Sequence, residues 1–166
     1  MTGASMRDYD SALTTFTPVQ ATPISQAELS GRVAALAQSL RGAGLSAVWL
    51  DATTALTYYT GLSLHASERL HGALLRADGS LLYVSPQFER PKLETLIRLP
   101  AEIAVWEEDE DPIALLAPHL QGRVGLDPGM AFGFAHRMMA LPGVQVASAG
   151  DLIAAQRRIK SPAEIA

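Results

Sequence analysis

The chain has 166 residues, 48% of them hydrophobic and 18% charged, and carries a formal net charge of −4 at pH 7. This composition is typical of one globular domain and excludes an intrinsically disordered chain, while the negative charge argues against nucleic acid or an anionic membrane as the main partner. Cysteine is absent, which excludes disulfides, thiolate metal sites and a cysteine nucleophile, and no apolar run reaches the length of a transmembrane helix.

Residues 1–22 are interpreted as an N-terminal extension, because charged residues interrupt them and they lack the apolar core of a secretory signal. We therefore expect a cytoplasmic protein, which is compatible with the absence of cysteine. The first helix begins at Ser25, which forms a capping box with Glu28, and it ends near Gly42. Apolar residues repeat along one face of this helix at helical spacing, and Leu36 among them is predicted to lie in the core.

Strands and helices alternate along the rest of the chain. A β-hairpin is indicated by strands at 71–76 and 81–84 around the turn Asp78-Gly79. Further strands are predicted at 45–50, 102–106, 124–126 and 144–147, with a short strand or irregular turn at 56–60. Further helices are predicted at 112–119, 131–140, 151–158 and 86–99, the last starting near Pro91 with Leu93, Leu96 and Ile97 directed inward.

This order of elements predicts a three-layer α/β/α fold. Single strands that alternate with helices imply parallel crossovers, whereas the hairpin requires an antiparallel pair. The expected sheet is therefore mixed, has five or six strands and is covered by helices on both faces.

The last residues have the features of a new helix. Ser161 suits the N-cap, Pro162 the first helical position, and Glu164 the returning carboxylate of a capping box. Because one helical turn is not stable alone, the sequence predicts the front part of a longer protein. We expect an extension at 1–22, a domain at 23–157, and a linker with the first turn of a further domain at 158–166.

The histidines do not have the spacing of a metal site. Apart from His65 and Glu68, no histidine is paired with a nearby ligand residue in a convincing pattern, so no metal site is expected within the chain. His71 is expected to be packed inside, His119 to lie near a helix C-terminus, and His136 to lie on a helix surface.

The polar loop from Gly61 to Arg69 is the best local candidate for a contact site. It joins two predicted strands, carries His65, Glu68 and Arg69, and would lie at a sheet end, where α/β proteins place ligands. The alternative is an ion pair beside a surface histidine, and the residues alone leave both open. The acidic run at 107–111 is interpreted as a solvated loop, the alternative being a site for a divalent cation or a basic partner.

Four segments, in order, resemble the N-terminal domain of the creatinase/prolidase/Xaa-Pro aminopeptidase family over roughly residues 25 to 166. They are Ala55-Leu56-Thr57-Tyr58-Tyr59-Thr60-Gly61-Leu62, then Glu68-Arg69 with the following hairpin, then Val124-Gly125-Leu126-Asp127, and Arg158-Ile159-Lys160-Ser161-Pro162-Ala163-Glu164-Ile165. The last segment is similar to the linker that enters the family's catalytic domain.

The resemblance implies that a pita-bread catalytic domain follows. Such a domain binds two divalent metal ions (Mn, Co or Zn) through Asp, Asp, His, Glu and Glu, and hydrolyses the bond before a proline. All catalytic residues and metal ligands would then lie outside this chain, which would be inactive alone. The resemblance also implies a homodimer or higher homo-oligomer, in which a loop of this domain closes the neighbouring active site. His65, Arg69 and Glu68 are the candidates for contacting the substrate or the partner subunit.

The expected whole protein is a dinuclear metal-dependent Xaa-Pro dipeptidase or aminopeptidase, in which this domain serves dimerisation and active-site closure. One alternative keeps the domain but assigns it to a creatinase-like amidinohydrolase with a small-molecule substrate, or to a non-catalytic peptidase-like binding protein. Another is a free-standing α/β domain that binds a small ligand or has a regulatory role. The sequence beyond Ala166 would discriminate between these functions.

Overall fold

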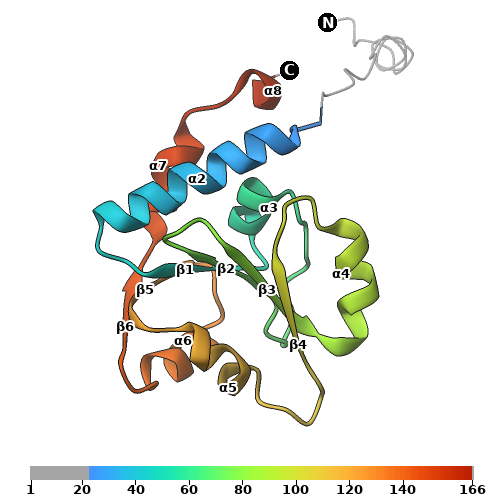
Figure 1. Cartoon of the computed structure of the whole chain (residues 1–166), viewed down its shortest axis with the longest axis vertical. Coiled ribbons are helices and arrows are strands. Elements are labelled where there is room, and N and C mark those ends of the chain that lie inside the picture. The colour runs from blue at the N-terminus through green and yellow to red at the C-terminus, as the bar shows by residue number, and fades with distance from the viewer. Residues whose placement is uncertain (1–22, 166) are drawn as a thin grey trace, which may run out of the picture. The chain divides into compact units, whose positions relative to one another are not determined.

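The computed structural model describes residues 23–165, and the extension expected at 1–22 lies outside this range (Figure 1). Residues 24–159 form one compact unit, whereas residues 160–165 belong to a second. The second unit contains helix α8 (Pro162–Ile165). The backbone N–H of Ser161 donates to Oε2 of Glu164 at 3.1 Å, and the N–H of Glu164 donates to the carbonyl of Ser161 at 3.0 Å. The helix start predicted at Ser161 is therefore confirmed.

Six strands within residues 23–165 form one mixed sheet in the order β4-β3-β2-β1-β5-β6. The strands are β1 (Ala47–Asp51), β2 (Gly72–Arg76), β3 (Leu81–Pro86), β4 (Glu102–Trp106), β5 (Gly122–Leu126) and β6 (Val144–Ser148). Strand β2 is antiparallel to both β1 and β3, whereas the pairs β1–β5, β5–β6 and β3–β4 are parallel. The mixed sheet predicted from the sequence is confirmed, and the hairpin supplies its antiparallel strand.

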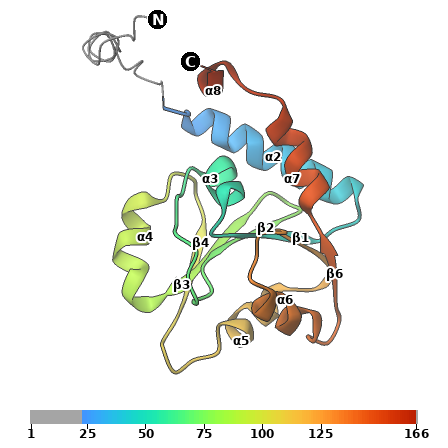
Figure 2. The same cartoon turned by 180° about the vertical axis from the view of Figure 1, so that it is seen from behind.

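Helices cover both faces of this sheet (Figures 1 and 2). One face carries α2 (Gln26–Gly42), α3 (Thr54–Thr60) and α7 (Gly150–Arg158). The other carries α5 (Pro112–Leu116), which continues into the 3-10 turn η2 (Ala117–His119), and α6 (Phe132–Met139). Beside β3 and β4 lie the 3-10 turn η1 (Gln87–Glu89) and α4 (Arg90–Leu96). Among residues 23–165, none of these helices combines the length and apolar character that crossing a bilayer requires.

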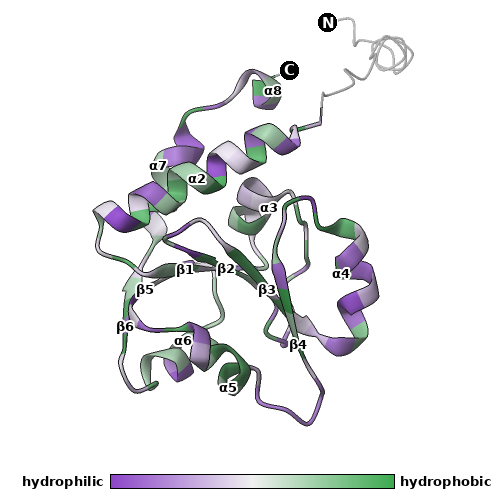
Figure 3. Ribbon diagram, in the orientation of Figure 1, coloured by the Kyte–Doolittle hydropathy of each residue, from purple (hydrophilic) through white to green (hydrophobic). Residues whose placement is uncertain are grey.

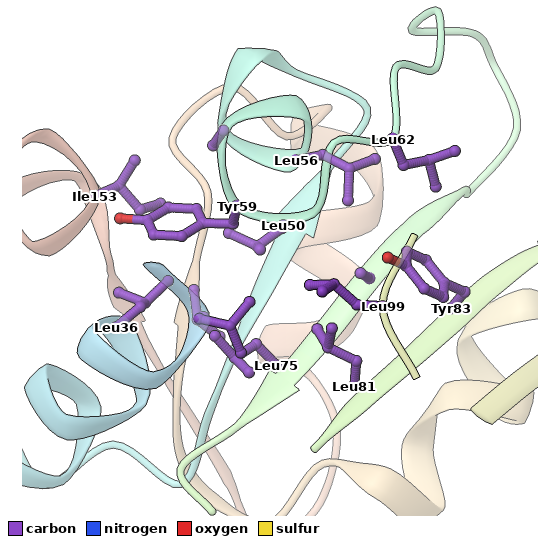
Figure 4. Packing of buried hydrophobic residues seen from close by; sticks show 14 of the residues in the cluster. Leu36, Leu50, Leu56, Tyr59, Leu62, Leu75, Leu81, Tyr83, Leu99 and Ile153 are labelled. Carbon is purple, nitrogen blue, oxygen red and sulfur yellow. The ribbon is translucent and has the colours of Figure 1, made fainter. Parts of the chain in front are cut away.

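The central strands are buried on both faces, which explains why they are apolar along their length (Figure 3). In β1, Val48 and Leu50 face the core beneath α2, while Trp49 faces the core beneath α5 and α6. Figure 4 shows Leu36 of α2 packed in the first core, which also contains Tyr59 of α3. Leu36 is fully buried, as the sequence predicts.

Residues 54–60 form the helix α3, so the strand or irregular turn predicted at 56–60 is wrong. The hydroxyl of Thr53 accepts a hydrogen bond of 3.1 Å from the N–H of Ala55 and thereby caps the helix. Leu56 and Tyr59 then lie on one buried face, and Gly61 ends the helix with a left-handed φ of 73°. Burial at helical spacing outweighs the strand preference of threonine and tyrosine.

The helix predicted at 86–99 is shorter in the structure. Pro86 still belongs to β3, and α4 ends at Leu96 because Ile97 adopts an extended backbone. Leu93 is buried as predicted and Ile97 packs against the core, but Leu96 is 38% exposed, so its inward orientation is wrong. Because the chain turns at Ile97, Leu99 rather than Leu96 fills the core.

Candidate functional site

The 61–69 loop lies at the end of the sheet where the parallel strands have their carboxyl ends. Strand β2 runs in the opposite direction, so its first residue, Gly72, pairs with Asp51, the last residue of β1. Strands β3 and β4 also end here, with Pro86 opposite Trp106. The loop joins a helix, α3, to β2 rather than joining two strands. This end of the sheet therefore gathers side chains from segments distant in the sequence.

Arg69 is held by two carboxylates at the end of this loop. Its Nε donates to Oε1 of Glu108 at 2.9 Å and one terminal nitrogen donates to Oε2 at 3.4 Å, while the other terminal nitrogen is paired with Glu68. The hydrogen bond with Glu108, followed by the charge of that carboxylate, raises the pKa of Arg69. The guanidinium carbon also lies 5.5 Å from the ring centroid of Phe88, which is 60% exposed. The arrangement presents a fixed cation beside an exposed aromatic ring.

Of the three predicted contact residues, the structure brings Glu68 and Arg69 together as an ion pair, while His65 is exposed on the same loop. His65 contributes its backbone carbonyl oxygen, which lies 2.7 Å from Nε2 of His71. His71 is buried, as predicted. The loop is thus anchored from beneath by a histidine that the sequence identified only as a packed residue.

The other two histidines lie away from this site. His119 ends the 3-10 turn η2, and its Nδ1 lies 3.2 Å from a terminal nitrogen of Arg76. His136 is exposed on α6, where its ring stacks on Phe132 with a centroid distance of 5.8 Å. Both positions agree with those expected from the sequence.

A small pocket of about 90 Å³ lies between the loop and the ends of β1 and β5. Its polar side chains are Asp51, Ser67, Arg69 and His71, and Phe134 of α6 forms part of its wall. Pockets that enclose an organic ligand have volumes of roughly 300–1,000 Å³. This surface is therefore better suited to a single polar group of a partner or substrate than to a whole enclosed molecule.

Two aspartates that sequence reasoning did not select lie at the ends of the neighbouring parallel strands β1 and β5. Asp127 is buried and accepts hydrogen bonds from the hydroxyl of Thr53 at 2.5 Å and the N–H of Gly129 at 2.9 Å. Burial raises the pKa of Asp51, and the nearby charge of Asp127 adds to the effect. The sequence pattern that could have identified both aspartates is an acidic residue directly after each of two predicted parallel strands.

The donor set does not fit a metal ion. Among residues 23–165, no three or more histidine, aspartate or glutamate side chains come together as a metal site requires. Arg69 is paired with carboxylates, and each carboxylate oxygen of Asp127 accepts a hydrogen bond from a neutral donor. What this surface can do chemically is bind and position a charged group.

The chain thus folds into an α/β/α domain that presents a fixed cation beside an exposed aromatic ring at one end of its sheet. The chain belongs to the Creatinase/Prolidase N-terminal domain family, which it matches over residues 32–159.

Its relatives carry peptidase names. An uncharacterized peptidase of Schizosaccharomyces pombe is 24% identical over 160 residues, which cover 88% of this chain and 36% of that protein. The dipeptidase PepE from Mycobacterium ulcerans superposes with a TM-score of 0.79 at 24% identity, over 87% of this chain and 40% of that one. A prolidase from Thermococcus sibiricus gives 0.74 at 20% identity, with 87% and 40% covered. The chain thus spans about two fifths of the length of these proteins, and the superpositions establish its fold.

Proposed function

We propose that this chain is the N-terminal, non-catalytic domain of an Xaa-Pro dipeptidase or aminopeptidase. The observation that carries the proposal is the extent of its similarity to peptidases, which covers 87–88% of this chain but only 36–40% of theirs. In this proposal the hydrolytic centre, with two divalent ions (Mn, Co or Zn), belongs to a domain that follows. The whole protein acts on a peptide as a homodimer or higher homo-oligomer.

Within this protein, the domain assists dimerisation and closes the active site through the 61–69 loop. Arg69 is the principal contact residue, because its guanidinium can bind a carboxylate through two parallel hydrogen bonds. Glu108 fixes one side of the guanidinium, whereas the side chain of Glu68 is 76% exposed and can move away. The nitrogen released by Glu68 would bind a carboxylate of the peptide or of the partner subunit, and His65 lies exposed on the same loop.

The test uses the full-length protein with Mn²⁺ and an Xaa-Pro dipeptide. Arg69→Ala is expected to raise KM or lower kcat/KM by about tenfold or more, the effect of losing a hydrogen bond to a charged group. Arg90→Ala is the matched control, because Arg90 forms an exposed pair with Glu94 on α4, outside the loop. The 166-residue chain alone is expected to give no turnover.

Turnover by the 166-residue chain would show that the active centre has been misplaced. Equal kinetics for Arg69→Ala and Arg90→Ala would remove the contact role of Arg69. A strictly monomeric full-length protein in light scattering would contradict the intersubunit role of the loop. Hydrolysis of a guanidino substrate in place of an Xaa-Pro peptide would assign the domain to an amidinohydrolase.

A further inference from the structure

His71 occupies the junction between the loop, the start of β2 and the turn after β3. Its side chain is only 5% exposed. Four charged or polar groups face it: the His65 carbonyl and Arg69 from the loop, Glu89 from the η1 turn, and Asp51 from the end of β1. A buried imidazole with these neighbours is a candidate for a functional role in addition to packing.

The two ring nitrogens of His71 both face oxygen atoms. Nε2 lies 2.7 Å from the carbonyl oxygen of His65. A carbonyl can only accept, so Nε2 carries a hydrogen and donates it. Nδ1 lies 4.0 Å from Oε2 of Glu89 and has no hydrogen-bond partner within residues 23–165. In the neutral ring, Nδ1 therefore turns a lone pair toward a carboxylate, whereas in the imidazolium it turns an N–H toward it.

We propose that His71 is a proton-dependent positioning residue for the 61–69 loop. When protonated, the ring donates at both nitrogens and links the His65 backbone to Glu89. When neutral, it keeps only the bond to His65 and loses its hold on the η1 turn. The proton is taken from and returned to solvent.

Protonation has a defined structural consequence. Oε2 of Glu89 must move by about 1 Å to reach hydrogen-bonding distance from Nδ1. Glu89 is directly preceded by Phe88, whose ring centroid lies 5.5 Å from the guanidinium carbon of Arg69, so a movement of the η1 turn acts next to the contact residue. Because it concerns regulation of the contact site, this inference rests on the proposed function. The coupling between protonation of His71 and the conformation of the loop, however, requires no catalytic activity.

The experiment follows ring and loop together in the 166-residue chain by ¹⁵N NMR between pH 5 and 8, the range in which histidines ordinarily titrate. The nitrogen shifts of His71 report its tautomer and protonation. The amide shifts and exchange rates of residues 65–69 and 87–89 report the loop and the turn. We expect the amide shifts to change with the same midpoint as the His71 ring, and we expect the amides to be more protected at the acidic end once the intrinsic pH dependence of amide exchange is divided out.

Three variants separate a linkage from simple packing. Glu89→Gln keeps the size of the side chain but removes the charge, and it should abolish the pH-dependent change in the loop amides while leaving the fold intact. His71→Gln can still donate to the His65 carbonyl but cannot be protonated, and it should give one loop conformation at every pH. His136→Gln removes an exposed histidine on α6 and should change nothing in the loop.

Loop amides that keep their pH dependence in Glu89→Gln would overturn the proposal. So would a His71 ring that titrates while these amides do not respond. Both results are read from the domain itself. They are therefore distinct from failure of the proposed function, which is measured as turnover by the full-length protein.

Discussion

The Nε of Arg69 donates a hydrogen bond of 2.9 Å to Oε1 of Glu108, which lies 39 residues further along the chain. A second long-range bond stands next to it: Nε1 of Trp106 donates to the carbonyl of Leu70 at 3.0 Å inside the core. The end of the loop is therefore fixed to β4 and to the residues that follow it. This leaves residues 65–68 exposed but tied to a rigid base, as a positioned contact surface requires.

Glu108→Gln should loosen Arg69 without unfolding the protein. Exposed ion pairs contribute little to stability, so the urea midpoint should move only slightly. The guanidinium, however, loses a charged partner that holds two of its nitrogens. We expect faster amide exchange at residues 67–69 and, in the proposed full-length peptidase, an increase in KM. Asp109→Asn removes the same charge from the same acidic run but leaves the Arg69–Glu108 pair in place. Equal effects of the two substitutions would mean that only the overall negative charge matters.

Local patterns in the sequence reveal most elements of this fold but few of its long-range pairings. The capping box at Ser25 and the hairpin around Asp78-Gly79 depend on residues a few positions apart, and both are present. The pair between Arg69 and Glu108 depends on β4 lying beside β3, so the acidic run alone predicts a solvated loop, or a site for a divalent cation or basic partner, but not a bond to Arg69. Periodicity cannot show which distant loop a carboxylate will reach.

Leu36→Ala tests the orientation of α2. Leu36 is fully buried in the core shared by α2, α3 and α7, so its truncation should cost about 2–5 kcal/mol of unfolding free energy. Leu96→Ala makes the same chemical change at a side chain that is 38% exposed on α4, and it should change stability by about 0.5 kcal/mol or less. Urea denaturation followed by circular dichroism measures both. A midpoint for Leu36→Ala close to that of Leu96→Ala would contradict the described packing.

At the candidate site, too, the sequence reveals residues that are close along the chain but not the contacts between distant segments. The sequence selects Glu68 and Arg69, which are adjacent and polar, and it predicts that His71 is packed. It cannot show that the ring of His71 reaches back to the carbonyl of His65, because that contact depends on how the loop folds over the start of β2. Asp51 and Asp127 are 76 positions apart in the sequence, and the parallel pairing of β1 with β5 brings them near each other.

Gly72→Ala should disrupt the start of β2. A Cβ at this position would lie 2.4 Å from the carbonyl oxygen of Leu50 and 2.8 Å from Cζ2 of Trp49, so the backbone must shift. Overpacking of this kind costs about 1–3 kcal/mol or more. Gly31→Ala is the matched control, because a Cβ there meets no atom within 4 Å and alanine favours the helix by about 0.5–1 kcal/mol. In thermal unfolding, the melting temperature should fall for Gly72→Ala and rise for Gly31→Ala. A Gly72→Ala protein as stable as the wild type would contradict the β1–β2 register.

Asp51→Asn should stabilise the domain at neutral pH. Burial raises the pKa of Asp51 above its ordinary value of 3.8, so the folded state binds the proton more tightly than the unfolded state does. The wild type therefore loses stability as the pH rises from 3.8 through the raised pKa, because the buried carboxyl must then ionise. Asparagine can still accept the hydrogen bond from Nε1 of Trp49 but carries no charge.

The difference in unfolding free energy between Asp51→Asn and the wild type should thus be small near pH 4 and reach its full size above the raised pKa of Asp51. Urea unfolding at a series of pH values measures this difference. Asp78→Asn provides a control of opposite sign, because hydrogen bonds from the backbone N–H and hydroxyl of Ser80 lower the pKa of Asp78. That variant should be less stable than the wild type at neutral pH, and the difference should vanish as the pH falls through the lowered pKa. If Asp51→Asn instead weakens the fold at neutral pH, the ionised carboxylate of Asp51 stabilises the folded state, and burial does not dominate the pKa of Asp51.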